Sequence, residues 1–423
     1  MSDLKRYLVP WIDQVKPYDT EDLVVAWSRP ELKRMMINEN PLPPSETVLN
    51  AILETARSGN RYPDSGPRIR AKIAKRYDLG PENVYTSHGS SEIIDMIMRL
   101  FVTPGDEVLL PNPTFSLYGI RARTVGGTVV TVDLTSELQY DVPAMLRAIT
   151  PRTKVIVVCT PNNPTGDFIS DGDLMKIVEV GIPTLIDEAY LEYHPEHESK
   201  APLIRKYNHV IVAHTFSKAY GLAGIRFGYA LADEALIQYF RKMQIPWNTS
   251  LLSMAAAEAA FEEEEELKRK AAYNNAGVDY VCRELSKIPG VRPYFSHGNY
   301  VLIDATDTGA TGKEIVDFVF DKAGVMLKHF APFREGKGSS ASAWALMKRM
   351  LSASSRSNSS SGTGRRRRRH EEKPLRTIDG DPSRTGNLVG FFSPDLQCLG
   401  RGTGEKDVPG PGQRSSGTTE EAL

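Results

Sequence analysis

The sequence predicts an α/β fold in which a mostly parallel central sheet is covered by helices on both faces. Short apolar runs alternate with amphipathic segments of helical period through residues 83–231. Strands interleaved with helices in this way predict βαβ units, whose crossovers make neighbouring strands parallel. A length of 423 residues can bury a sizeable core and allows two or three domains. The expected strands are 83–86, 107–110, 127–132, 154–159, 184–186, 210–213 and 227–231, and the expected helices between them are 92–101, 115–122, 142–149 and 171–180.

The residues on either side of this alternation predict the domain organisation. The first 44 residues end in an extended Pro-rich run, and we expect them to join a small domain next to the substrate site. The tail is rich in Ser and Gly and contains the arginine run 365–369, so it buries too little apolar surface to fold and is expected to be disordered. The expected domains are the N-terminal segment 1–44, a large domain 45–275, a small α/β domain 276–338 and the tail 339–423. Their further elements are expected helices at 45–56, 69–77, 250–285 and 313–322 and strands at 300–303 and 324–327.

The composition excludes several classes of protein. Acidic and basic residues almost cancel, to a formal charge of -1, which favours neither a nucleic-acid nor a membrane partner. The cysteines Cys159, Cys282 and Cys398 have no metal-ligand spacing and predict free thiols in a reducing compartment, without a metal site. No apolar run approaches the ~18 residues that span a bilayer, and the N-terminus has no apolar signal region. We therefore expect a cytoplasmic protein.

Lys218 is the candidate nucleophile. It follows the apolar run 210–213, and small residues and glycines around it leave room for its amine to be held out of water. Burial lowers the pKa of an amine, and a neutral amine can attack a carbonyl. Arg226, eight residues later, can hold a phosphate near the same lysine. A lysine with a phosphate clamp indicates pyridoxal phosphate, although Ser-Lys in an ordinary surface turn and Arg226 as an ordinary surface charge are also compatible with this stretch alone.

Two motifs support a bound cofactor. The run Gly89-Ser-Ser-Glu92 opens a helix directly after a strand, so backbone N–H groups and the hydroxyls of Ser90 and Ser91 meet the positive end of the helix dipole. This predicts a phosphate cradle, although the same residues also form an ordinary capping box. Phe115 follows a strand and a Pro-rich turn, where its ring can lie on a heteroaromatic cofactor or belong to the core.

Three polar residues follow the next strands. Asn163 comes after the apolar strand 155–159 and can donate to a phenolate oxygen, although Asn-Pro also makes turns. Asp187 ends the next strand, where a buried carboxylate can pair with a protonated ring nitrogen. Tyr190 lies three residues later, within reach of the phenolate side. Asn38, near the Pro-rich run, can cap or line the same site.

These motifs, in this order, resemble the fold-type I pyridoxal-phosphate enzymes, specifically the class I/II aminotransferases, and are most similar to histidinol-phosphate aminotransferases. The resemblance runs from about Met36 to Lys337. It rests on Asn38-Glu-Asn-Pro41, Arg61-Tyr-Pro-Asp64, Gly89-Ser-Ser-Glu92, Asn163-Pro-Thr-Gly166, Asp187-Glu-Ala-Tyr190, and Ser217-Lys218 with Arg226.

The resemblance implies a role for each site residue. Lys218 would bond to pyridoxal 5'-phosphate and move the proton, and Asp187 would pair with the pyridine nitrogen. Tyr62 would reach the cofactor phosphate from the neighbouring subunit, which implies a homodimer. The remaining implied roles are Asn163 and Tyr190 at the phenolic oxygen, Phe115 on the ring, Ser90, Ser91, Ser217 and Arg226 at the phosphate, and Asn38 and Lys328 at the substrate.

The resemblance also implies a reaction. An amino group would pass from histidinol phosphate to 2-oxoglutarate, giving imidazole acetol phosphate and glutamate, a step of histidine biosynthesis. A broader amino-acid aminotransferase and a threonine-phosphate decarboxylase share this scaffold and stay open. Lys328 departs from the arginine that histidinol-phosphate enzymes usually place near the substrate phosphate, and lysine binds phosphate without a bidentate fork.

The C-terminus departs further from the family. Family members close the small domain with a segment like Phe-Arg-Val-Ser-Val-Gly-Thr, whose arginine grips the substrate, whereas this chain continues after Gly338 as Ser339-Ser-Ala-Ser-Ala-Trp. Codons for that run, read from the third base of the Ser339 codon, permit the family segment. We therefore hypothesise a frameshift near Gly338, and sequencing the gene tests it. A cofactor-binding but inactive product and a tail-mediated binding protein are the corresponding alternatives.

Overall fold

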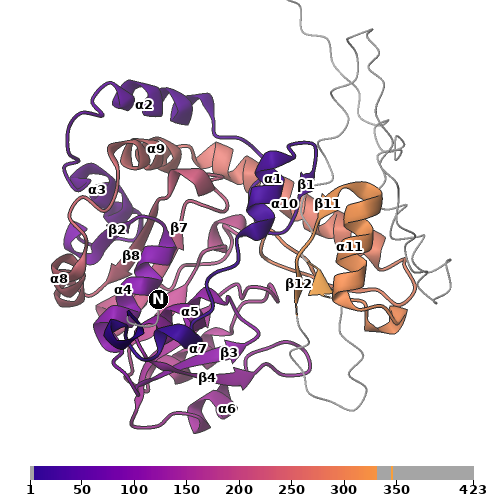
Figure 1. Ribbon diagram of the computed structural model, residues 1–423. Helices are drawn as coiled ribbons and strands as arrows, with labels where there is room; N and C mark the ends of the chain where they lie inside the picture. The colour runs from indigo at the N-terminus through magenta and orange to yellow at the C-terminus, as the bar shows by residue number, and fades with distance from the viewer. Residues whose placement is uncertain (1–3, 331–343, 346–423) are drawn as a thin grey trace, which may run out of the picture.

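A seven-stranded sheet forms the main body of the computed structural model, which describes residues 4–330 and 344–345 (Figure 1). The strand order is β2-β8-β7-β6-β5-β3-β4. Only β8 is antiparallel to its neighbours, so the prediction of a mostly parallel sheet is confirmed. The strands are β2 Val84–Ser87, β3 Glu107–Asn112, β4 Thr128–Asp133, β5 Thr153–Cys159, β6 Thr184–Asp187, β7 Val210–Thr215 and β8 Gly228–Ala232.

The central strands are buried on both faces. In β5, Ile156 and Val158 pack in one hydrophobic cluster while Val155 and Val157 pack in another, as the period of two in a strand requires. Helices α2, α3, α6, α7 and α9 contribute to the first cluster, and α4, α5 and α8 to the second. These helices are α2 Glu46–Ala56, α3 Pro67–Arg76, α4 Ser90–Phe101, α5 Leu117–Thr124, α6 Val142–Arg147, α7 Asp171–Val178, α8 Glu234–Met243 and α9 Leu251–Glu262.

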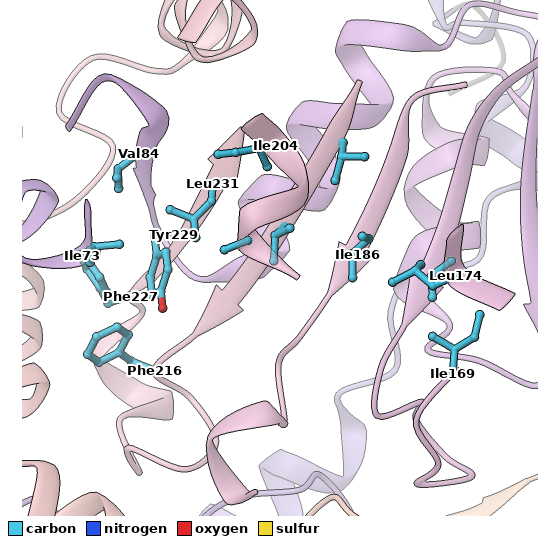
Figure 2. Packing of buried hydrophobic residues seen from close by; sticks show 14 of the residues in the cluster. Ile73, Val84, Ile169, Leu174, Ile186, Ile204, Phe216, Phe227, Tyr229 and Leu231 are labelled. Atoms are coloured by element: carbon cyan, nitrogen blue, oxygen red, sulfur yellow. The ribbon is translucent and has the colours of Figure 1, made fainter. Parts of the chain in front are cut away.

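Aromatic rings anchor the first cluster at the end near the nucleophile candidate. Figure 2 shows Phe216, Phe227 and Tyr229 gathered beside Ile73 of α3, with Leu174 of α7 farther along the same cluster. The rings of Phe216 and Phe227 meet edge to face with centroids 4.9 Å apart. Because Phe216 lies two residues before Lys218, this packing fixes the backbone from which the lysine projects.

A second α/β unit lies beside the sheet and includes part of the N-terminal segment. Strand β1 pairs in parallel with β11, so indigo and orange segments lie side by side in Figure 1. Helix α11 begins with a capping box of Thr311 and Glu314 and ends at Gly324 in the left-handed conformation. The elements are α1 Glu21–Ser28, β1 Lys33–Arg34, α10 Glu264–Leu285, β9 Arg292–Tyr294, β10 Leu302–Asp304, α11 Gly312–Ala323, β11 Val325–Met326, β12 His329–Phe330 and β13 Trp344–Ala345.

The prediction of one continuous helix over 250–285 is wrong. The segment forms two helices, α9 and α10, separated at Glu263, whose ψ of 62° is not helical. Consecutive glutamates repel one another across a helical turn, and Glu263 instead accepts a hydrogen bond from the Ser45 hydroxyl at 2.5 Å. Helix α1 and strand β1 were also not expected, because the first 40 residues carry no clear apolar period.

Most of the predicted tail lies outside the described residues. The frameshift hypothesis, the run 365–369, Cys398 and nearly all of 339–423 therefore concern residues of which the structure says nothing. Trp344 and Ala345 are the exception, since their backbones pair with β12 in a short antiparallel ladder.

Candidate active site

The lysine amine lies at the carboxyl ends of the strands, where ligands bind in open α/β sheets. Lys218 follows β7, and its Nζ donates to the Asn38 carbonyl oxygen at 3.2 Å and lies 5.5 Å from the centroid of the Tyr190 ring. Desolvation lowers the pKa of the amine to about 8; the charge of Glu39 opposes this shift and that of Arg226 adds to it. Near neutral pH a usable fraction of the amine is therefore neutral and nucleophilic.

A fixed carboxylate ends the adjacent strand β6. Asp187 is 3% exposed, and its Oδ2 accepts from the Tyr118 hydroxyl at 2.7 Å while its Oδ1 accepts from the Ala189 backbone N–H at 3.1 Å. Burial raises the pKa of Asp187, and these two hydrogen bonds oppose the shift. The hydrogen bonds orient a carboxylate that can pair with a cation in the site.

A buried phenol lies between the amine and two amides. The Tyr190 hydroxyl accepts from Asn38 Nδ2 at 3.0 Å and from Asn163 Nδ2 at 3.3 Å. Asn299, which the sequence analysis missed, donates to the Asn38 carbonyl at 3.3 Å. The side-chain carbonyls of Asn38 and Asn299 are buried and have no partner among the described residues, which leaves two acceptors for a bound molecule.

An anion cradle forms where α4 meets Arg226. The Arg226 guanidinium donates to Ser217 Oγ at 3.3 Å, to the Ala223 carbonyl at 2.9 Å and to the His88 carbonyl at 3.4 Å. A Cβ on Gly89, which precedes α4 with φ +80°, would lie 2.3 Å from an Arg226 nitrogen. Glycine therefore lets the guanidinium reach the helix N-terminus, where it adds to the positive end of the dipole.

The serines of the cradle begin α4. Ser90 and Ser91 are the first two residues of that helix. A Cβ on Gly228, at the start of β8, would lie 2.7 Å from the Ser90 backbone nitrogen. The absence of a side chain at Gly228 thus keeps the cradle and the sheet in contact, as the close approach of two backbones requires.

Phe115 and Lys328 meet at a residue that the sequence analysis did not single out. The Phe115 and Tyr18 rings lie edge to face with centroids 6.3 Å apart, and Lys328 Nζ lies 6.0 Å from the Tyr18 centroid. Phe115 also contacts Tyr118, the donor to Asp187, with centroids 5.5 Å apart. Phe115 precedes α5, which begins two residues later than the expected start of that helix, so no helical spacing from Phe115 could have pointed to Tyr118.

Within one chain, Tyr62 does not belong to the group of residues around Lys218. Its side chain is 74% exposed and stacks on Trp247, with centroids 4.1 Å apart and an interplanar angle of 18°. The structure therefore brings Lys218 and Asp187 together with the cradle but leaves Tyr62 on the surface.

A buried cluster of charged side chains lies next to the site and acts on Asp187. His214 of β7 contacts Glu188 at 3.1 Å and Glu192 at 3.0 Å and stacks on Tyr229 with centroids 4.8 Å apart. Burial alone would lower the pKa of His214, but the hydrogen bonds and charges of the two glutamates raise it to about 9. An imidazolium thus lies in the neighbouring strand β7, one residue beyond Ala213, the strand partner of Asp187, and its charge partly opposes the rise in the pKa of Asp187.

The described residues contain neither a membrane-spanning helix nor a candidate metal site. In that part of the chain no helix is both long and apolar enough to cross a bilayer. Nor do its His, Cys, Asp and Glu side chains form a group of three or more that could hold a metal ion.

The fold and the site define an α/β enzyme with a partly desolvated amine beside an anion cradle. The family model for aminotransferase class I and II matches residues 32–342. This chain belongs to the class I and II aminotransferase family.

Curated relatives agree with this family. A histidinol-phosphate aminotransferase of Caldanaerobacter subterraneus subsp. tengcongensis is 32% identical over 330 residues, 77% of this chain and 90% of that protein. A histidinol-phosphate aminotransferase of Bacillus subtilis is 34% identical over 304 residues, 69% of this chain and 84% of that protein.

Solved structures show the same fold. The histidinol-phosphate aminotransferase of Sinorhizobium meliloti, in complex with pyridoxal-5'-phosphate, superposes with a TM-score of 0.71 at 24% identity, covering 81% of this chain and 92% of that chain. The aspartate aminotransferase of Thermus thermophilus with maleate gives 0.70 at 22% identity, covering 81% and 94%. The prediction of a fold-type I architecture is therefore confirmed.

Proposed function

We propose that this protein is a pyridoxal 5'-phosphate-dependent aminotransferase that moves the amino group of histidinol phosphate to 2-oxoglutarate, in histidine biosynthesis. The proposal rests mainly on one observation: Lys218, Asp187 and the Arg226 cradle lie together at the carboxyl ends of β6 and β7. The curated relatives bear the name of this activity.

The residues present fit the cofactor. An aromatic aldehyde with a phosphate, a phenolic oxygen and a ring nitrogen needs an amine, an anion cradle, a hydrogen-bond donor and a carboxylate. Lys218 has a lowered pKa, and Gly89 leaves the cradle open to Arg226. We propose that Ser90, Ser91, Ser217 and Arg226 hold the phosphate, Asn163 and Tyr190 the phenolic oxygen, Asp187 the ring nitrogen and Phe115 the ring face.

The chain's own groups then account for catalysis. When bound, the cofactor accepts the donor's amino group and withdraws electrons from the donor's Cα. Lys218 Nζ, held by the Asn38 carbonyl, takes the proton from that Cα. Asp187, fixed by Tyr118, holds a positive charge on the ring nitrogen.

We propose substrate contacts on the small-domain side. The side-chain Oδ1 of Asn38 is buried without a partner among the described residues, and it can accept from a donor group of the substrate. Lys328 lies beside Tyr18 at 6.0 Å from the ring centroid, and its ammonium can bind a phosphate as a point charge. The donor is thus expected to carry an anionic group.

We also propose a homodimer in the cytoplasm. The exposed Tyr62 ring, stacked on Trp247, presents an aromatic pair that a second copy of the chain would cover. Cys159 and Cys282 are free thiols, which supports a reducing compartment.

The test is a single-turnover spectrum. The protein is purified with pyridoxal phosphate, and histidinol phosphate, aspartate, phenylalanine and threonine phosphate are added separately. We expect the cofactor absorbance to convert fully with histidinol phosphate and to return on addition of 2-oxoglutarate, and not to change in Lys218→Ala. Faster conversion by aspartate or phenylalanine would indicate a broader aminotransferase. Carbon dioxide release from threonine phosphate would indicate a decarboxylase, and a bound cofactor that never converts would indicate an inactive product.

A further inference from the structure

A second polar cavity lies apart from the active site. It has a volume of about 220 Å³ and is bounded by α3, β2, α8 and the segment 247–249. Its lining includes Arg70, Arg241 and Thr249, but none of the residues that approach Lys218. Since a water molecule takes about 30 Å³ of liquid volume, this cavity has room for a small ion with several waters.

Two arginines line this cavity and form no ion pair with any described residue. Arg70 projects from α3 and Arg241 from α8, and burial together with the charge of Arg241 lowers the pKa of Arg70. Within the described part of the chain, neither guanidinium donates a hydrogen bond or forms an ion pair, and the lining has no Asp or Glu. The charge of Asp64 raises the pKa of Arg70, but Asp64 forms no ion pair with it; the Asp64 Oδ1 accepts from the Gly66 backbone N–H at 3.0 Å.

Two buried donors at this cavity also lack partners. Arg70 Nε and Thr249 Oγ1 are buried and have no partner among the described residues, and Thr249 is only 4% exposed. An unsatisfied buried polar group destabilises the fold, so such groups usually mark a missing partner.

Among the described residues, the other two arginines whose Nε lacks a partner differ from Arg70. The Nε atoms of Arg34 and Arg121 are also buried without a partner. Those two side chains nevertheless form ion pairs through Nη2, with Glu39 at 2.7 Å and with Asp95. Arg70 has no such pair among the described residues, so its guanidinium as well as its Nε lacks a direct partner.

We propose that Arg70, Arg241 and Thr249 form a binding site for a phosphate-sized oxyanion. Two guanidinium groups supply planar forks of donors that match the oxygens of phosphate or sulfate, and the Thr249 hydroxyl supplies a further donor. Inorganic phosphate and the terminal phosphate of an ester share this chemistry. The site is independent of transamination and lies beside Trp247, on which Tyr62 stacks.

The test is calorimetric titration of inorganic phosphate into the full-length protein loaded with pyridoxal phosphate, so that the cofactor cradle is already filled. We expect Arg70→Gln and Arg241→Gln to weaken phosphate binding about tenfold or more, as the loss of a charge-assisted contact does, and Thr249→Val to weaken it less. Phosphate should also raise the melting temperature of the parent protein.

Matched controls keep the test specific. Arg68→Gln and Lys242→Gln remove exposed cations that are close in sequence to Arg70 and Arg241, and they should leave phosphate binding unchanged. If Arg70→Gln does not fold, Arg241→Gln and Thr249→Val decide the question. A parent protein that binds no phosphate at millimolar concentration would overturn the proposal, as would binding that all these variants retain. The first result is expected if a carboxylate of a second copy fills the cavity.

A second titration, with a phosphate monoester, distinguishes the two ligands that share this chemistry, inorganic phosphate and a phosphate ester. A titration with a phosphate monoester that binds as tightly as inorganic phosphate would identify a site open to larger ligands. Much weaker binding of the ester would confine the site to free oxyanions. Either result supports an oxyanion site only if Arg241→Gln weakens the binding of that ligand about tenfold or more.

Discussion

Lys218 is the residue on which the proposed chemistry depends most directly. We expect Lys218→Ala to lower kcat by about 10³-fold or more, because a positioned general base contributes about 10²–10⁴-fold. The measurement is steady-state turnover of histidinol phosphate with 2-oxoglutarate. Lys206→Ala, which removes an exposed lysine next to Tyr207, is the matched control and should keep full activity. Comparable losses in both variants would argue against a specific role.

The lowered pKa of Lys218 predicts a pH dependence. Only the neutral amine attacks a carbonyl, so the rate at which cofactor-free protein takes up pyridoxal phosphate should rise with pH and level off above about 8. Absorbance stopped-flow measures this rate. A rate that keeps rising toward 10.5, the ordinary pKa of a lysine amine, would show that the amine is not desolvated.

His214 is predicted to stabilise the fold through its charge. His214→Gln would leave Glu188 and Glu192 without the buried cation between them, and breaking such a pair typically costs about 3–5 kcal/mol. The measurement is the free energy of unfolding in urea. His209→Gln, which removes a hydrogen bond to a carbonyl rather than to a carboxylate, should cost much less.

The cluster of His214, Glu188 and Glu192 also determines how the stability of the fold changes with pH. The folded pKa of His214, about 9, lies above the ordinary value of 6.5, so its stabilisation is complete below pH 6.5 and is lost as the pH rises through about 9. In His214→Gln this part of the pH dependence should disappear. Parallel pH profiles for the two proteins would contradict the prediction.

At the level of residues, the sequence predicts the polar groups that follow strands. Asp187 and Lys218 could be found because parallel strands bring their carboxyl ends to one edge of the sheet. Tyr18 and Asn299 could not, because each comes from a segment without a strand-end signal and reaches the site only when the small α/β unit packs on the sheet. Their positions depend on tertiary contacts at sequence separations that local patterns do not carry.

At the level of elements, the contact between β8 and α4 depends on Gly228. A methyl group there would lie 2.7 Å from the Ser90 backbone nitrogen, so Gly228→Ala should displace the helix N-terminus. We expect cofactor affinity to fall about tenfold or more, because the cradle's N–H groups lose their positions. Fluorescence titration with pyridoxal phosphate measures the effect.

Gly172 provides the matched control for this substitution. It lies in α7, where an added Cβ has no heavy atom within 4 Å. Gly172→Ala should therefore leave cofactor affinity unchanged and stabilise the helix by about 0.5–1 kcal/mol. An equal loss of affinity in both variants would mean that the contact of Gly228 is not the cause.

The alternation of apolar runs predicts which strands and helices exist but not how they are arranged. It correctly gave a mostly parallel sheet, because βαβ crossovers impose that direction. It could not give the order β2-β8-β7-β6-β5-β3-β4 or the reversed direction of β8, since β8 follows β7 through an irregular connection without a crossover helix. Strand β1 was missed because two residues carry no period, and its pairing with β11 spans almost the whole described chain.

At the level of the whole molecule, the departure after Gly338 bears on activity. The family model ends its match at residue 342, close to the predicted frameshift. If the native reading frame restores a substrate-binding arginine, a repaired gene should give a protein with a lower KM for histidinol phosphate and an unchanged affinity for pyridoxal phosphate, because the cofactor residues all precede Gly338. Equal KM values in the two proteins would show that the arginine is not needed.

The proposed homodimer makes a prediction that a single chain cannot satisfy. If Tyr62 acts in the partner's site, a hybrid of one Lys218→Ala chain and one Tyr62→Ala chain has one site in which both residues are intact. Mixing equal amounts of the two inactive variants under exchange conditions should then restore about a quarter of the parent activity, because about half of the dimers are hybrids and each has one intact site. A Lys218→Ala chain mixed with a Lys218→Ala, Tyr62→Ala chain should restore nothing. If Tyr62 served its own chain, the first mixture would also stay at the level of its components, because every site would then lack either Lys218 or Tyr62.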